Sequence, residues 1–439
     1  MKKLCNRILA ALLALLCIGG LVACTAKPEQ AVTQPQVQEG EDLIPSQNSP
    51  AIKDQLTWEK LNSFPIKWSD MSIDEARMLC VAYFDFYKTA LWTPSEDVYY
   101  IRNSSGSDDQ MLKGKIYGGL PYIGLGSGTL YRLMDYMDEE TGVVDMHRAL
   151  KTDDLSQVTM AEMRFFGNQC ANGAFGGWGR VINTISSIAT ANMTHARGCL
   201  RLGDYTYSQE RWTEDARTTA VLQEMGQQRI FACYALLQPG DGLVYYTSAG
   251  HVIMCSEGAV VQYNEDGTIN GDESFIHIID QGQSWGDGVN KDGDKYLYKE
   301  NNGAKKSFSS LFSTNYVPFT FAEFLGTDPI EETEITFSHT GDKITLSQYF
   351  SSTVKCNYAI CDVYAIVTND AGEEIYRHVI RSSSSGTQSM NITEFGSSTY
   401  TNDTDTWGSL SAGTWNLEVV AQLGTGERPT VYVGKLVVE

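Results

Sequence analysis

Apolar residues recur with a helical period in the first half of the chain. Ser72–Glu75, with the sequence Ser-Ile-Asp-Glu, has the form of a capping box, in which the serine and glutamate side chains bind the first amides of a helix. The helix that it predicts presents one apolar face and runs to about Trp92, where Thr93-Pro94 ends it. The same spacing predicts helices over residues 128–140 and 213–236.

From Gly240 onward the pattern changes to the period of strands. Short apolar or alternating runs are separated by Gly, Asp and Asn, which is typical of an antiparallel sheet. These runs are Leu243–Tyr246, His251–Cys255, Val260–Tyr263 and Phe275–Ile279. Helices that are followed by strands predict an α+β domain over residues 56–328.

After Asp328-Pro329 the chain shows strand and turn signals and no helix signal. Alternating runs are separated by Gly, Asn, Asp and Ser, and they predict a β-sandwich domain of immunoglobulin-like type over residues 329–439. The predicted strands are Glu334–Ser338, Lys343–Ser347, Tyr358–Thr368, Glu374–Ser382, Thr414–Leu423 and Thr430–Val438.

The N-terminus has the features of an export signal. Basic residues precede an apolar run over Ile8–Val22, which is too short to span a bilayer comfortably but fits a signal peptide. The run ends in small residues before Cys24 and resembles the bacterial lipobox, in which the peptide is cut before a cysteine that then carries lipid. We therefore expect a signal peptide over residues 1–23 and a lipid on Cys24. The chain would be anchored on the extracellular face of the cytoplasmic membrane.

Composition limits the partners. Residues 24–55 are rich in Gln, Pro, Glu and Ser and predict a disordered tether. No later stretch reaches the length of about 18 apolar residues that a transmembrane helix needs. The formal net charge of −21 argues against a nucleic-acid partner, because phosphate groups are bound by Lys and Arg.

Ten cysteines give no metal pattern. Cys5, Cys17 and Cys24 lie in the N-terminal segment, and the other seven form neither a CxxC pair nor a Cys/His cluster. We therefore expect no zinc site and assign no cofactor. Because seven is odd, at least one thiol lies outside any disulfide, and we expect most of them to be buried thiols.

One cysteine stands where a nucleophile would be activated. Cys170 lies where a loop that contains Gly167 enters a predicted helix. A cysteine attacks as the thiolate, which the amides of a helix N-terminus or an imidazolium stabilise. The same amides could bind an oxyanion. Glycines recur along the helix and predict that a strand packs closely against it; they are Gly173, Gly176, Gly177 and Gly179.

His251 is the predicted partner of this cysteine. It begins a strand directly after Gly250. A histidine that acts as a base needs an acceptor on its far ring nitrogen. The next strand ends in Asp280, and antiparallel pairing would return that end to the start of the His251 strand. Asp280 is therefore predicted to orient the imidazole, with Gln281 and His277 as alternatives. Each residue taken alone also fits a structural role, as core, surface or turn.

Four segments in this order resemble the motifs of a known family. They are Gly119–Tyr122, Gln169–Gly173, Pro239–Gly242 and His251-Val252. They resemble the G-x-P-Y, D-C-S-G, P-G-D-L and H-V motifs of the NlpC/P60 superfamily of papain-like cysteine peptidases, and of the related CHAP amidases. The resemblance covers roughly residues 115–285. Gln169 stands where the family has Asp.

The resemblance implies a papain-like fold and cleavage of a peptide or amide bond in peptidoglycan. Cys170 would attack the carbonyl, His251 would shuttle the proton, and Tyr122 and Gln169 would lie near the oxyanion. An acidic third residue at Asp280 matches the CHAP pattern, whereas His277 would match the NlpC/P60 alternative. Two other functions remain open: a catalytically inactive surface protein that binds or adheres, and a transglutaminase-like acyltransferase.

Overall fold

In a computed structural model the chain forms two units, residues 1–43 and 44–439, and all residues that the structure describes lie in the second unit, from Leu56 onward. The described residues are 56–67, 70–101, 108–183, 199–203, 218–247, 250–282, 304–382, 386–392, 400–401 and 410–439. The predicted signal peptide, the lipid on Cys24 and the tether lie outside these residues. Within the described part, no helix has both the length and the apolar character needed to cross a membrane.

The capping box and the helix that follows it are present. In α4 (Ile73–Thr89), the Ser72 side chain accepts from the amide of Glu75, and the Glu75 side chain accepts from the amide of Ser72. The helix ends at Thr89, earlier than predicted, because the following residues form strand β1 (Leu91–Pro94). The indole of Trp92 in this strand donates to the Gly119 carbonyl at 2.7 Å. A short helix, α3 (Trp58–Asn62), precedes α4.

The prediction that helices come first and strands second is wrong for the segment between α4 and the helix that begins at Cys170. A four-stranded sheet in the order β4-β1-β6-β5 and a β2-β3 pair lie there. Three of these six strands have only two residues, which is too short for alternation to be read. Their bounds are β2 (Val98–Ile101), β3 (Asp108–Met111), β4 (Tyr117–Gly118), β5 (Met137–Asp138) and β6 (Val143–Val144). The short helices among them are α5 (Leu130–Met134), α6 (Met146–Leu150) and η1 (Glu162–Phe165).

The predicted helix over residues 213–236 is two helices. They are α9 (Thr218–Met225) and α10 (Gln227–Tyr234). The first five residues of the predicted helix lie outside the described part. Gly226 separates them with φ of 76°, a left-handed conformation that glycine adopts without a steric penalty.

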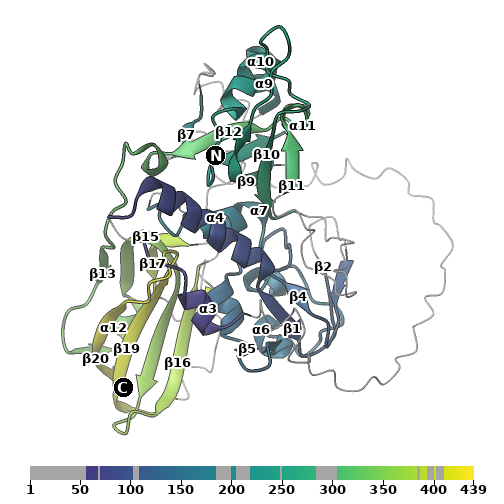
Figure 1. The fold of residues 1–439 in the computed structure, drawn as a ribbon. Helices are drawn as coiled ribbons and strands as arrows, with labels where there is room; N and C mark the ends of the chain where they lie inside the picture. Colours follow the sequence, from purple (N-terminus) through teal and green to yellow (C-terminus); the bar gives the residue numbers. More distant parts are fainter. Residues whose placement is uncertain are drawn as a thin grey trace, which may run out of the picture. The chain divides into compact units, whose positions relative to one another are not determined.

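The predicted antiparallel sheet is present and has six strands in the order β11-β10-β9-β8-β12-β7 (Figure 1). All of its pairings are antiparallel. The strands are β7 (Cys199–Arg201), β8 (Gly242–Tyr246), β9 (Gly250–Val260), β10 (Phe275–Asp280), β11 (Ala304–Ser307) and β12 (Val317–Phe321), with α11 (Phe308–Ser313) and η3 (Glu323–Leu325). The predicted separate strand Val260–Tyr263 is not formed, because β9 continues to Val260 and Tyr263 makes only an isolated bridge to Ile269.

Helix α7 (Cys170–Trp178) packs between α4 and β9 at very short range. A Cβ atom placed on Gly177 would lie 2.9 Å from the Met254 side chain and 3.0 Å from the Cys80 carbonyl oxygen. A Cβ atom on Gly173 would lie 3.2 Å from the side chain of Gln281. The prediction that these glycines permit close approach of a strand is confirmed for Gly177, whereas Gly176 lies against Tyr87 of α4.

The region after residue 329 is rich in strands, as predicted. Its strands hydrogen-bond into one sheet in the order β14-β20-β19-β15-β16-β18, with β13 and β17 also paired to β15. The sixteen-residue strand β15 pairs first with β13 and β17 and later with β16 and β19, so the sheet curls. The strands are β13 (Ile335–Phe337), β14 (Lys343–Thr345), β15 (Thr353–Thr368), β16 (Glu374–Arg381), β17 (Thr387–Asn391), β18 (Tyr400–Thr401), β19 (Gly413–Leu423) and β20 (Thr430–Val438).

One helix in this region contradicts the prediction that it has none. Helix α12 (Leu346–Phe350) begins at a capping box between Thr345 and Gln348, so the predicted strand Lys343–Ser347 ends at Thr345.

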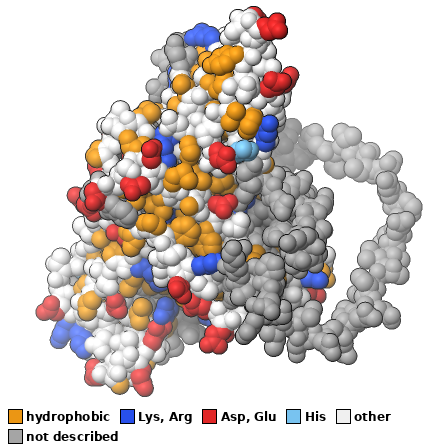
Figure 2. Space-filling model, in the orientation of Figure 1, with side chains coloured by type: hydrophobic (Ala, Val, Ile, Leu, Met, Phe, Trp, Pro, Cys, Tyr) orange, Lys and Arg blue, Asp and Glu red, His pale blue; other side chains and the backbone are white. Residues whose placement is uncertain are grey.

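On the face of the molecule drawn in Figure 2, Lys and Arg side chains are scattered among Asp and Glu and do not gather into a stripe.

The close packing of α7 gives a matched pair of substitutions. Gly177→Ala should lower the free energy of unfolding by about 1–3 kcal/mol, because the new methyl group would overpack the contact with β9 and α4. Gly176→Ala, whose Cβ atom would lie 3.5 Å from the Tyr87 ring, should raise it by about 0.5–1 kcal/mol through helix propensity. Urea denaturation measures both. Equal stabilisation by the two variants would show that close packing at Gly177 does not limit the helix.

Candidate active site

Cys170 is the first residue of α7, at the position where helix amides have no partner within the helix. Gln169 precedes it in an extended conformation, and its side chain makes no capping hydrogen bond. The thiol is almost completely buried, with 6% of the residue exposed. The first turn of the helix therefore offers N–H groups beside the sulfur that could stabilise an anion.

The Tyr122 segment lies directly beside the residues that lead into Cys170. The amide of Asn168 donates to the Pro121 carbonyl at 2.7 Å, and the amide of Ile123 donates to the Asn168 carbonyl at 2.8 Å. Tyr122 thus forms a parallel bridge with Asn168, two residues before the cysteine, and its side chain is buried. The structure brings Tyr122 and Gln169 to the same turn as Cys170.

His251 meets both of its predicted partners. It lies near the start of β9, opposite Tyr245 of β8. Its Nε2 atom lies 2.6 Å from Oδ1 of Asp280, and Cys170 is close enough to the imidazole to contribute to raising its pKa. Because Nε2 faces the carboxylate, Nδ1 is the ring nitrogen left for the sulfur. The three residues therefore form one chain of contacts from a thiol through an imidazole to a carboxylate.

The two alternative third residues lie elsewhere. His277 faces the side chain of Glu257, with its Nδ1 atom 2.8 Å from Oε2. Gln281 is fully buried, and its amide donates to the Leu120 carbonyl at 3.4 Å. Gln281 therefore supports the segment that leads to Tyr122, and Asp280 is the one of the three that contacts His251.

The ion pair sets the charge of the site. Burial lowers the pKa of His251, but the Asp280 carboxylate and the contact with Cys170 raise it more, so that its pKa is well above the ordinary value of 6.5. Burial raises the pKa of Asp280, but His251 together with Lys88 and Lys306 lowers it below the ordinary value overall. At neutral pH the carboxylate is therefore ionised and the imidazole readily holds a proton.

Three residues near the pair were not singled out from the sequence. Lys88 of α4 is buried, and burial lowers its pKa to about 8 although Asp280 raises it. The Tyr245 ring lies 6.0 Å from the His251 ring, and the Tyr316 ring meets Tyr245 edge-on at 5.1 Å. Lys88 could have been predicted from the sequence, because a lysine on the apolar face of a helix is unusual. No local sequence feature distinguishes Tyr245 or Tyr316.

The Pro-Gly-Asp turn before β8 has a structural role. Asp241 is fully buried, and its Oδ1 atom accepts from Arg77 of α4 at 2.8 Å and from Thr320 of β12 at 2.6 Å. Arg77 also donates to the Pro239 carbonyl at 2.9 Å. These bonds fix the start of β8 against α4 and β12, and β8 in turn pairs with the His251 strand.

The prediction of buried thiols is confirmed for the seven cysteines among the described residues. None of these seven forms a disulfide, and all are buried. Burial raises the pKa of Cys199 and of Cys361 to about 12. It also raises the pKa of the Cys80 and Cys255 thiols. These four thiols are therefore disfavoured as thiolates at neutral pH.

Comparison with known proteins gives no family. No protein-family model matches the chain, and no curated protein matches it. Among solved structures, the chain is similar to the extracellular domain of a one-component system from B. thetaiotaomicron, at 9% sequence identity and a TM-score of 0.14. The match covers 78% of this chain and 46% of that chain. At this TM-score it carries no argument about fold or function.

The ion pair predicts a pH window of stabilisation. Because the pKa of Asp280 is lowered, its contribution is complete above its ordinary value of 3.8 and is lost as the pH falls through the lowered pKa. Because the pKa of His251 is raised, its contribution is complete below 6.5 and is lost as the pH rises through the raised pKa. The difference in the free energy of unfolding between the wild type and Asp280→Asn should therefore be largest between these two values, at about 3 kcal/mol.

Urea denaturation over a pH series measures this difference. Asp266→Asn is a suitable control for the alkaline limb, because hydrogen bonds from Thr268 in an exposed turn lower the pKa of Asp266 and its contribution is constant there. A difference for Asp280→Asn that stays constant through the alkaline limb would contradict the assignment of the pair.

Proposed function

We propose that the chain is a cysteine hydrolase that cleaves a peptide or amide bond, with Cys170 as nucleophile, His251 as general acid and base, and Asp280 as the residue that orients the imidazole. One observation carries the proposal. The side chain of His251 contacts the Cys170 thiol and the Asp280 carboxylate at the same time, at the N-terminus of α7. A nucleophile, a base and an orienting acceptor are the three parts that such a site requires.

The reaction follows from this arrangement. The Cys170 thiolate attacks the carbonyl carbon, and a C–S bond forms while the oxyanion is held by the first-turn N–H groups of α7, with Tyr122 and Gln169 beside it. The imidazolium gives its proton to the leaving nitrogen, and the C–N bond breaks. Water then attacks the thioester, His251 takes one proton from it, and the C–S bond breaks to release the acid and restore the thiolate and the imidazolium.

The electrostatics of the site support this cycle. An imidazole with a raised pKa is stable as the imidazolium, and it can therefore pair with the thiolate before substrate arrives. The Asp280 carboxylate remains charged at all stages because His251, Lys88 and Lys306 favour its ionised form. The imidazole is 85% withdrawn from solvent, so these charges act through a medium of low polarisability.

The proposal also includes a papain-like fold and a substrate in the cell wall. A cysteine at the head of a helix that packs on an antiparallel sheet bearing histidine and an acid is what a papain-like domain of the NlpC/P60 or CHAP type requires. We assign residues 56–328 to such a domain and residues 329–439 to a β domain of immunoglobulin-like type, in which one curled sheet encloses the core in place of two separate sheets. Together with export and a lipid on Cys24, the resemblance favours peptidoglycan as the substrate, at the extracellular face of the membrane.

Hydrolysis of purified peptidoglycan by the wild type tests the proposal. Cys170→Ala should lower kcat/KM by more than about 10³-fold, and His251→Ala should have an effect of the same order, because each removes a part that acts only with the other. Asp280→Asn should cost less than either. Release of free amino and carboxyl groups, identified by mass spectrometry, measures the rate and shows the bond that is cut.

Cys199→Ala is the control, because it removes a buried thiol on β7 that lies outside the proposed chain of contacts. Equal rates for Cys170→Ala and the wild type would exclude cysteine catalysis. Binding of peptidoglycan without turnover by both proteins would support the non-catalytic surface protein instead. Transfer of the acyl group to an added amine in preference to water would support the acyltransferase.

A further inference from the structure

A glycine-rich loop holds the nucleophile turn on both sides of Cys170. We call residues 126–128 the clamp loop. The Asn168 side chain donates to the Gly128 carbonyl at 2.6 Å, and the Asn172 side chain donates to the Gly126 carbonyl at 2.6 Å. Cys170 lies midway between these two asparagines. The position of the clamp loop is therefore transmitted to the residues before the cysteine and to the first turn of α7.

The contact between the clamp loop and this turn is backbone against backbone. The amide of Gly128 donates to the Gly167 carbonyl at 2.7 Å. A Cβ atom on Gly126 would lie 2.5 Å from the Asn168 amide nitrogen, a distance at which no side chain fits. At Gly126 and Gly128 the two backbones are in direct contact, so a displacement of one segment displaces the other.

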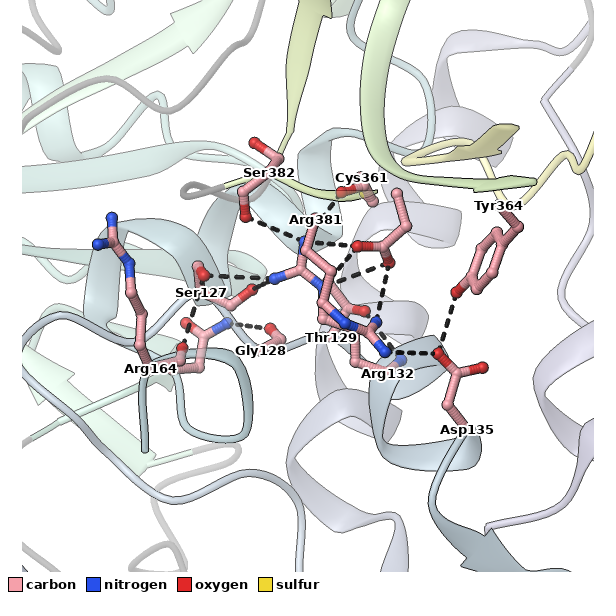
Figure 3. Close-up of polar contacts among 12 residues, drawn as sticks. Ser127, Gly128, Thr129, Arg132, Asp135, Arg164, Cys361, Tyr364, Arg381 and Ser382 are labelled. Atoms are coloured by element: carbon pink, nitrogen blue, oxygen red, sulfur yellow. Dashed lines mark hydrogen bonds and ion pairs between the residues drawn. The ribbon is translucent and has the colours of Figure 1, made fainter. Parts of the chain in front are cut away.

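Arg132 connects the clamp loop to the sheet that β13–β20 form, which we call the C-terminal sheet (Figure 3). This arginine of α5 is buried, and its guanidinium donates to the Ser127 carbonyl in the clamp loop at 2.7 Å. The same guanidinium donates to Asp362 of β15, with Nε 2.9 Å from Oδ1. It also donates to the carbonyls of Cys361 at 2.9 Å and Ser382 at 3.1 Å. One planar group therefore bonds the clamp loop and two segments of the C-terminal sheet at once.

A second arginine at the same interface makes no bond to the clamp loop. Arg381 of β16 lies 3.7 Å from Asp362, and it donates to Asp135 at 3.1 Å and to the Tyr136 hydroxyl at 2.8 Å. It is as buried as Arg132 and shares the Asp362 carboxylate. Arg381 therefore matches Arg132 in burial, charge and partner but not in its contact with residues 126–128.

We propose that Arg132, held by Asp362, is a positioning residue for Cys170 and that the C-terminal sheet is part of the support of the nucleophile. The proposal rests on the proposed function and adds a role for residues about 40 and 190 positions away from the cysteine. Buried charges hold their geometry because each displaced hydrogen bond leaves an uncompensated charge. The guanidinium thereby fixes Ser127, and Ser127 fixes the glycines that bond Asn168 and Asn172.

Lysine in place of either arginine keeps the charge but loses the planar fork. Arg132→Lys should slow alkylation of Cys170 by iodoacetamide by at least about fivefold, because the amine cannot reach Ser127 and the sheet at the same time. Arg381→Lys should change this rate by less than about twofold even where it lowers the Tm by a similar amount. Peptide mapping by mass spectrometry measures the rate at Cys170, and the buried thiol Cys80 in the same digest reports unfolding.

Asn172→Ala removes the hydrogen bond from Asn172 to the Gly126 carbonyl and leaves the buried charges in place. It therefore tests the positioning role even where Arg132→Lys does not fold. It should also slow alkylation of Cys170. Equal rates in Arg132→Lys and Arg381→Lys, or an unchanged rate in Asn172→Ala, would overturn the positioning role. If wild-type Cys170 reacts no faster than Cys80, the proposed function itself fails. A fast wild type with unaffected variants refutes only the role of Arg132.

Discussion

The contact between His251 and Asp280 is the interaction on which the site depends. Burial alone would lower the pKa of the imidazole and favour its neutral form. The carboxylate at 2.6 Å reverses this preference, because it stabilises the imidazolium in a place that water barely reaches. Without Asp280, the thiol of Cys170 would face a neutral ring in a poorly polar environment, and neither partner of a thiolate–imidazolium pair would be favoured.

The scaffold brings these groups together through a few close contacts. Antiparallel pairing of β9 with β10 places Asp280 opposite Ile253, next to the start of the His251 strand. The glycines of α7 allow the helix to lie against β9, so that a cysteine at its first position reaches the imidazole. The buried pair of Arg77 and Asp241 fixes the turn before β8, and Arg132 joins Asp362 to Ser127 in the loop beside the turn that contains Cys170.

The sequence predicted the features that depend on local pattern. The capping box at Ser72, the strand that ends at Asp280 and the strand that begins near His251 were read from spacing and turn residues, and all are present. The two-residue strands around β1 could not be read, because alternation has no meaning over two positions. The bond between Arg132 and Asp362 joins residues 230 positions apart, and no local signal marks either partner. Such contacts follow only from the tertiary fold.

The ultraviolet absorbance of a thiolate tests most directly whether Cys170 and His251 form a thiolate–imidazolium pair. The difference spectrum between the wild type and Cys170→Ser should show one thiolate per chain, which the His251 imidazolium stabilises. The same difference measured in a His251→Ala background should show none. A thiolate signal that appears only at alkaline pH, or that survives the loss of His251, would contradict the pair.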